Sequence, residues 1–200
     1  MDYGFLIKGI LLQLVLFCFI PFIYWLIKRR TEISFFRYVG LIQAKRTGKV
    51  IKITVFACSY IIVYGIVHFI PIISALTQPS AYAYEKVGVA AIIPGIFVCF
   101  IQQALSEEVL FRGFIGKLFI SKIGFNYGNI MQAIVFSSIH VLLSVSNDKD
   151  IVSYLIIFIS ITAGGWLLGY LDEKLSGGSI IPSILLHGLG NYIMILSAAF

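Results

Sequence analysis

Long runs of apolar residues, separated by short polar stretches, dominate this chain. A helix needs about 20 residues to cross a bilayer, and runs of that length occupy residues 5–27, 51–76, 87–106, 129–146, 151–171 and 179–200. A further run, Val109–Ile123, is less apolar and either continues the third helix or forms a separate short one. The pattern predicts an all-α fold, a polytopic transmembrane helix bundle with six to seven membrane-spanning helices.

The runs favour helices over the strands of a membrane barrel. Backbone polar groups in lipid need partners within the fold, which leaves helices and closed barrels as the spanning structures. Barrel strands alternate apolar and polar residues, whereas these runs are continuous. The first run is followed by Lys28-Arg29-Arg30 and has no A-x-A site, so we expect a retained first span rather than a removable signal peptide.

Basic residues between the first two runs predict the orientation. Cytoplasmic loops carry an excess of Lys and Arg, so we expect this segment, 112–128 and 172–178 on the cytoplasmic side, and the N-terminus outside. Residues 32–46 mix apolar and cationic side chains and predict either an amphipathic helix on the membrane surface or a solvated linker. Eight of the chain's 15 cations lie between these runs or at the start of the second: Lys28, Arg29, Arg30, Arg37, Lys45, Arg46, Lys49 and Lys52.

Composition narrows the class of protein. Hydrophobic residues make up 60% of the 200 residues and charged residues 12%, with a mean hydropathy of +0.99. A soluble domain is nearer half apolar and a quarter charged, so a soluble enzyme, a disordered chain and a disulfide scaffold are excluded. We expect the net charge of +6 to reflect basic loops and not a nucleic-acid partner. Cys18, Cys58 and Cys99 lie inside apolar runs without CxxC spacing, which is typical of small hydrophobic side chains.

Ionisable side chains inside a membrane span need a reason, because each costs roughly 2.5–3.5 kcal/mol on insertion scales. Glu107 and Glu108 lie four to five residues before Arg112. On a helix Glu108 and Arg112 can pair, while Glu107 is turned away by about 100°. An ion pair that anchors the helix end at the membrane boundary would explain this segment equally well.

Two further segments place histidines deep inside runs. His140 follows Phe136 and lies about 11 residues into its run, and His187 lies about eight residues into the last one. His187 and Asn191 share a helix face, and the glycines between them permit a close helix approach. An interhelical hydrogen bond or a polar packing seam would explain each segment by itself.

Taken together, the three segments supply two carboxylates, two imidazoles, an amide and a guanidinium. All must face the interior of the bundle to avoid lipid, so we expect one shared polar cavity. Such a cavity can hold a water, a carboxylate that deprotonates it and donors for an oxyanion, which is what peptide hydrolysis requires. We expect Glu107, His140 and His187 to lie within one side-chain reach of a common water.

The three motifs also carry a family resemblance. Glu107-Glu108…Arg112, Phe136…His140 and His187…Asn191 reproduce, in order, the patterns E-E-x-x-x-R, F-x-x-x-H and H-x-x-x-N. The chain therefore resembles the CPBP intramembrane proteases, also called the Abi family, which includes the CAAX prenyl endopeptidases. The resemblance covers the helical core 87–200, while 1–86 form a two-span segment with the basic loop, all within one compact membrane domain.

The resemblance implies a role for each residue. It makes Glu107 the general base, with His140 orienting the water and with His187 and Asn191 stabilising the oxyanion. Three residues are expected to shape the site: Glu108, Arg112 and Phe136. As for cofactors, zinc held by Glu107, His140 and His187 with water as fourth ligand stays open, and a metal-free glutamate mechanism is favoured.

The expected function is that of an intramembrane endopeptidase of the cell membrane, with a site that opens toward the cytoplasm. Its expected partners are membrane lipids and a membrane-associated peptide or protein, prenylated CAAX-type substrates included; the oligomeric state stays open. One alternative is a non-catalytic adaptor or bacteriocin self-immunity protein that binds a peptide or partner through the same pocket. Another is a small transporter with a proton relay, although no inverted repeat supports it.

Overall fold

The fold is known from a computed structural model, which describes residues 3–44, 52, 56, 59–60, 83–144 and 150–200. All regular elements in these ranges are helical, as the hydrophobic pattern predicts. They are α1 (Tyr3–Lys28), α2 (Phe35–Val39), η1 (Gly88–Ala91), α6 (Ile92–Ile96), η2 (Phe97–Leu105), α7 (Ser106–Glu108), η3 (Val109–Gly116), α8 (Lys117–Leu143), α9 (Ile151–Tyr170), η4 (Leu171–Leu175) and α10 (Ile181–Ala199).

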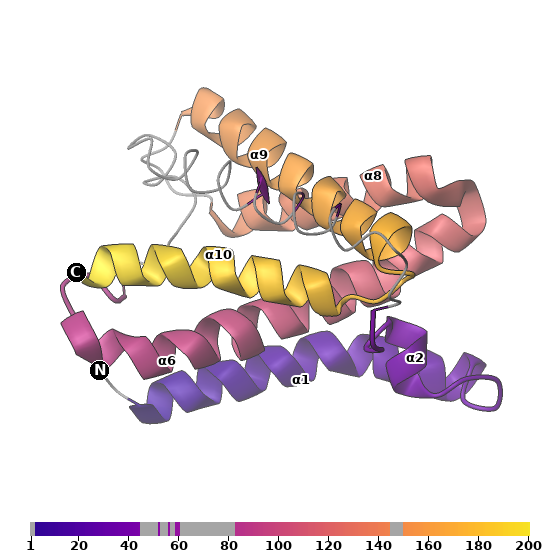
Figure 1. Cartoon of the computed structure of the whole chain (residues 1–200), viewed down its shortest axis with the longest axis horizontal. Coiled ribbons are helices and arrows are strands. Elements are labelled where there is room, and N and C mark those ends of the chain that lie inside the picture. Colours follow the sequence, from indigo (N-terminus) through magenta and orange to yellow (C-terminus); the bar gives the residue numbers. More distant parts are fainter. Residues whose placement is uncertain (1–2, 45–51, 53–55, 57–58, 61–82, 145–149) are drawn as a thin grey trace.

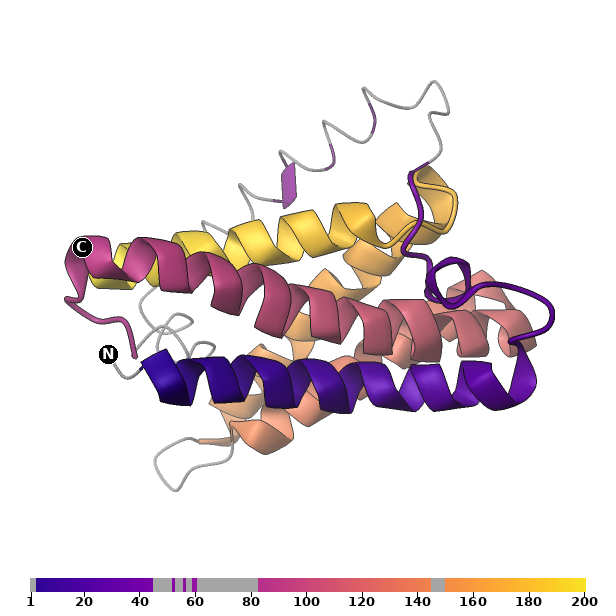
Figure 2. The same ribbon diagram turned by 90° about the horizontal axis from the view of Figure 1, so that it is seen from below.

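The elements from η1 to η3, α6 and α7 included, continue into the first turns of α8 as one long helix. It begins with the third predicted run, 87–106, and is called the third helix below. This third helix, the central helix of the site, ends at Gly124, where φ of 78° and ψ of 169° leave helical geometry. Glycine suits this position because other residues rarely adopt positive φ. The chain reverses there, and the rest of α8 runs back along the bundle (Figures 1 and 2). The run Val109–Ile123 therefore continues the third helix, which is the first of its two predicted alternatives.

Four helices in the described ranges are long and apolar enough to span a membrane. They are Gly4–Lys28, Gly88–Leu143, Ile151–Leu175 and Ile181–Ala199. The second of these contains the reversal at Gly124, with predicted runs 87–106 and 129–146 on either side of it.

The predicted six to seven spans are not reached in the described part of the chain. The run 51–76 accounts for part of this difference, because it lies outside the described residues except for 52, 56 and 59–60. His68, for which we expect a structural or interfacial role, also lies outside them.

The outer faces of the helices carry large apolar side chains that the protein leaves uncovered. Leu12 and Phe19 of α1 and Leu155 and Ile159 of α9 each expose more than half of their surface. Apolar exposure on this scale indicates that lipid, and not water, covers these faces. The chain is a multi-pass membrane protein.

Several connections meet at one end of the bundle, on the right in Figure 1. The Ile180 N–H donates to the Gly40 carbonyl oxygen at 2.9 Å. The Lys117 ammonium contacts the Glu173 carboxylate at 2.7 Å and the Gly178 carbonyl oxygen at 2.8 Å. The predicted orientation requires these segments to share one side of the membrane, and the structure places them at one end; which side that end faces stays a prediction.

The basic segment contains a short helix that packs on the bundle. Helix α2 has five residues and ends at Gly40. Val39 is fully buried while Phe36 is 63% exposed, and the Tyr38 ring packs against those of Tyr24 and Phe114. As far as residue 44, the segment is therefore not a solvated linker, and its placement along the membrane surface stays a prediction.

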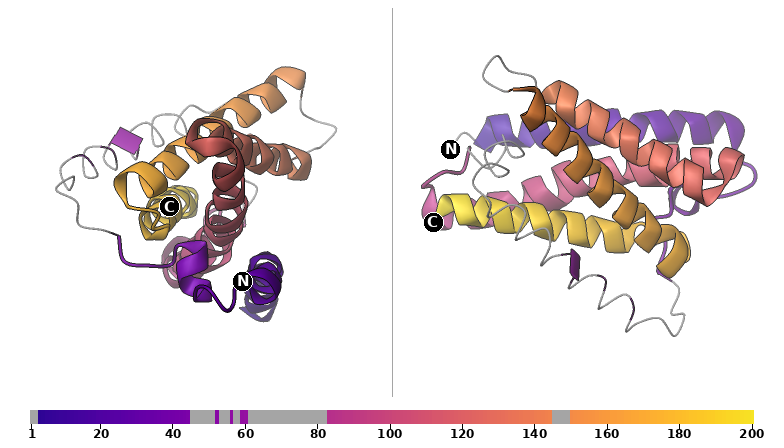
Figure 3. Two further views of the ribbon diagram at one scale, coloured as in Figure 1. Left: turned by 90° about the vertical axis from the view of Figure 1, so that its right-hand side faces the viewer. Right: turned by 90° about the horizontal axis from the view of Figure 1, so that it is seen from above.

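The third helix has neighbours on several sides. Helix α1 lies alongside it (Figure 2), and α9 crosses the bundle obliquely against α8 (Figure 3). Helix α10 packs so closely on it that a Cβ at Gly188 would overlap the Phe100 ring. The close helix approach predicted from the glycines after His187 is confirmed at Gly188.

Candidate active site

The two adjacent glutamates lie where the third helix departs from regular α geometry. Glu107 and Glu108 belong to the short α-helical turn α7, between the π-helical segments η2 and η3. Such π-helical turns are rare and are often found at functional sites. The two side chains leave the helix in different directions, so their partners differ, with His187 lying between the two carboxylates.

Glu108 is held inside the bundle. Its side chain is 0% exposed, and Oε1 lies 3.1 Å from Nη1 of Arg112, whose side chain is 2% exposed. The same Oε1 lies 2.8 Å from Nδ1 of His187. The Arg112 guanidinium carbon lies 4.1 Å from the centroid of the Phe136 ring, a cation–π distance. The predicted pair is confirmed, and because the helix continues from Arg112 to Gly124, the pair does not anchor a helix end.

Glu107 faces two imidazoles across a small gap. Its Oε2 lies 3.7 Å from Nε2 of His140 and 3.9 Å from Nε2 of His187. Among the described residues, no group donates a hydrogen bond to this buried Oε2. Both distances exceed a direct hydrogen bond and suit a bridging water. The structure thus brings together the three side chains for which a common water is expected.

The hydrogen bonds of the two histidines define which ring nitrogen faces Glu107. Nδ1 of His140 lies 2.9 Å from the Phe136 carbonyl oxygen, and because a carbonyl only accepts, Nδ1 carries the proton. In the neutral ring Nε2 then presents a lone pair to Glu107. His187 is held similarly, with Nδ1 donating to the Glu108 carboxylate. Glu108 therefore orients His187 toward Glu107.

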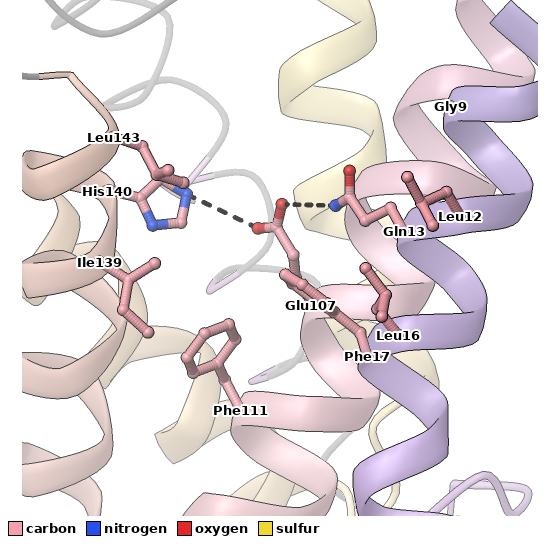
Figure 4. Close-up of a pocket in the computed structure, with 10 residues that line it drawn as sticks. All are labelled: Gly9, Leu12, Gln13, Leu16, Phe17, Glu107, Phe111, Ile139, His140 and Leu143. Carbon is pink, nitrogen blue, oxygen red and sulfur yellow. Dashed lines mark hydrogen bonds and ion pairs between the residues drawn. The ribbon is translucent and has the colours of Figure 1, made fainter.

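A pocket of about 330 Å³ adjoins these groups. Figure 4 shows it between the first half of α1 and the last turns of α8, with Glu107 pointing across it at His140. Polar and apolar side chains line it: Gly9, Leu12, Gln13, Leu16, Phe17, Glu107, Phe111, Ile139, His140 and Leu143. Most of the wall is apolar, so a ligand that fits it must itself be largely apolar.

Asn191 lies one turn after His187 on α10. The two residues share a helix face, as predicted, and Asn191 faces the third helix. Its Nδ2 donates to Oε1 of Gln103 at 2.9 Å, and Gln103 lies one turn before Glu107. This bond joins α10 to the third helix close to the carboxylate. Asn191 is not among the residues that line the pocket.

Sequence reasoning missed the glutamines that surround Glu107. Gln13 donates to Glu107 from α1, Gln102 contacts Gln13, and Gln103 holds Asn191. The sequence did contain a signal for Gln13. In the run 5–27, Lys8 and Gln13 are the two residues with charged or amide side chains, and such a side chain within a span needs a polar partner.

In the ranges that the structure describes, no group of three or more His, Cys, Asp and Glu side chains is arranged to hold a metal ion. The zinc site left open by the sequence, with Glu107, His140 and His187 as ligands, therefore gains no support from the structure. Nδ1 of His187 is engaged by Glu108, and Nε2 of each histidine faces Glu107.

Comparison with known families places the third helix and the later helices, as far as residue 193, in one family model. Residues 88–193 match the family described as Type II CAAX prenyl endopeptidase Rce1-like. The match spans more than half of the chain and contains all three motifs, so the chain belongs to this family, and the predicted resemblance is confirmed. Membership implies a CAAX-type, protease-like hydrolase. No curated protein and no solved structure matches the chain.

Proposed function

We propose that this protein is an intramembrane endopeptidase of the cell membrane, which hydrolyses a peptide bond in a membrane-associated peptide or protein. The observation that carries the proposal is the convergence of Glu107 Oε2 on Nε2 of both His140 and His187. This group adjoins an apolar pocket, and the family to which the chain belongs supports a hydrolase.

Glu107 acts as the general base in the proposed reaction. A water between its Oε2 and Nε2 of His140 donates one hydrogen to each, which directs an oxygen lone pair at the substrate. Glu107 takes a proton from this water as the water oxygen attacks the carbonyl carbon of the substrate. His140 stays neutral and orients the water through the Nε2 lone pair, since Nδ1–H is held by the Phe136 carbonyl.

The tetrahedral intermediate then needs donors for its oxyanion and a proton for its leaving group. His187 is the nearest candidate donor, because Glu108 holds its Nδ1 while its Nε2 faces the site and can donate to the oxyanion once it carries a proton. Asn191, on the same face of α10, is the second. Glu107 returns its proton to the amide nitrogen, the C–N bond breaks, and a carboxylate and an amine leave.

The side of the membrane from which substrate enters belongs to the proposal as well. The pocket lies toward the end of the bundle where α1 begins and α8 ends, away from α2 (Figure 1). The orientation predicted from the basic segment puts that end outside, whereas the expected site opens to the cytoplasm. Labelling of Leu143→Cys by a membrane-impermeant maleimide distinguishes the two orientations. Labelling in intact cells places the pocket end outside, and labelling in inverted vesicles places it on the cytoplasmic side.

Purified protein in liposomes provides the test of the function. The probes are internally quenched peptides that end in a CAAX sequence, with and without a farnesylated cysteine. We expect wild-type protein to release fragments that mass spectrometry identifies, and Glu107→Ala and His140→Ala to release none while remaining folded. Binding of the probes without cleavage would overturn the proposal and favour the adaptor.

A further inference from the structure

Helix α1 lies outside the matched segment 88–193, yet it places the amide of Gln13 against the candidate base Glu107. Nε2 of Gln13 lies 3.4 Å from Oε1 of Glu107 and 3.2 Å from the Ser106 hydroxyl oxygen. On its other side, Oε1 of Gln13 accepts from Nε2 of Gln102 at 3.2 Å. Both ends of the Gln13 amide are therefore in use, and Figure 4 shows it pointing at Glu107 from across the pocket.

The orientation of this amide follows from its neighbours. A carboxylate only accepts hydrogen bonds, so the amide nitrogen of Gln13, and not its oxygen, must face Glu107. Rotating the amide by 180° would set its oxygen against the Glu107 oxygen and its NH₂ against the NH₂ of Gln102. Gln102 and Glu107 together thus specify a single arrangement of Gln13.

This contact divides the Glu107 carboxylate into two unlike oxygens. Oε1 is held by Gln13, whereas Oε2 faces both imidazoles and has no hydrogen-bond partner among the described residues. A carboxylate on a flexible glutamate side chain can rotate, and a general base must point at the proton that it removes. A donor on Oε1 keeps Oε2 directed at the water site.

We propose that Gln13 is a positioning residue for Glu107, and that α1 is thereby part of the active site of this protein. The inference rests on the proposed function of Glu107 as the base. Gln13 does not take part in proton transfer; its amide restricts the carboxylate to the orientation in which Oε2 faces Nε2 of His140 and of His187. The same helix supplies half of the residues that line the pocket.

The kinetic test replaces the amide by an apolar side chain of similar size. For Gln13→Leu we expect kcat on the quenched peptide to fall about tenfold with KM within about twofold of wild type, because misplacing a reacting group by a fraction of an ångström lowers the rate steeply. A leucine suits the surrounding lipid and pocket, so membrane abundance should not fall. The matched control is Leu11→Ala, on the exposed face of α1 and outside the pocket; it should leave kcat unchanged.

A second measurement needs no substrate. In Gln13→Lys the introduced amine should condense with the Glu107 carboxyl when a hydrophobic carbodiimide is added, forming an amide and releasing water to the reagent as a urea. Mass spectrometry would locate the cross-link, and Leu11→Lys is the control that should form none.

The outcomes separate this inference from the proposed function. A missing cross-link, or an unchanged kcat in Gln13→Leu beside an active wild type, overturns the role of Gln13 and leaves the protease intact. A fall confined to KM, or one matched by Leu11→Ala, overturns it as well. An inactive wild type overturns the proposed function, and the positioning role with it. The cross-link together with a loss in kcat supports both.

Discussion

Glu107 and Glu108 are neighbours in sequence, yet their surroundings differ in kind. Glu108 is sealed in the interior, where its Oε1 contacts a guanidinium and an imidazole at close range. Glu107, whose side chain is 12% exposed, lies against a pocket, and its Oε2 faces two imidazoles at longer distances. Breaking a buried ion pair destabilises the fold, whereas a titratable group beside a pocket is a candidate for chemistry. In the proposed function, one residue of displacement along the helix thus separates a supporting group from a reacting one.

The largest effect on the rate of cleavage is expected from substitution of Glu107. Glu107→Gln keeps the shape of the side chain and removes the base, so the rate of peptide cleavage should fall by roughly 10²–10⁴-fold. The unfolding midpoint should stay close to that of wild type, because Glu107 is not part of the buried ion pair. Initial rates and thermal unfolding in detergent measure both. Glu85→Gln, at an exposed position, is the control, and an active Glu107→Gln protein would remove Glu107 from the mechanism.

The opposite pattern is expected for the partner of Glu108. Arg112→Met leaves the Glu108 carboxylate buried without its cation, and breaking such a pair costs about 3–5 kcal/mol of stability. Unfolding in detergent should therefore occur well below the wild-type midpoint. Lys86→Met breaks an exposed pair and should change stability by about 0–1 kcal/mol. Equal midpoints for Arg112→Met and wild type would show that the buried pair does not support the fold.

His140 belongs with Glu107 in this comparison. His140→Phe preserves an aromatic ring beside Phe136, at a present centroid distance of 4.3 Å, but removes the Nε2 acceptor. We expect cleavage to fall about 10²-fold with little change in unfolding. A loss of folded protein would instead assign His140 to the supporting group around Glu108.

The smallest effect is expected from removal of metal ions. Glu107 carries the proton in the proposed reaction, so cleavage by purified protein should proceed at the same rate with and without EDTA. Mass spectrometry of the fragments checks that the same bond is cleaved in both samples. A chelator that abolished cleavage, with recovery on adding zinc, would replace the proposed mechanism by a metal-dependent one.

Sequence patterns predicted the helical class and gave the third-helix continuation as one of two alternatives, because hydrophobicity and length act locally. The pairing of Glu108 with Arg112 was also predictable, since a spacing of four residues specifies it on a helix. Gln13 and Gln103 were not, because their contacts depend on how separate helices pack. Asp172 shows the same limit: it belongs to the segment 172–178, for which only a side of the membrane was predicted, and the structure buries it to 1% exposure while its neighbour Glu173 pairs with Lys117.

The position of the Phe136 ring has a wider consequence. It lies against the guanidinium on the Glu108 side and against the imidazole of His140 on the Glu107 side. A single aromatic side chain thus packs against both the buried ion pair and a histidine of the candidate site, whereas His187 contacts both carboxylates. Leucine at this position would fill much of the same volume but would offer the guanidinium no electron-rich face, so one substitution would weaken the packing on both sides at once.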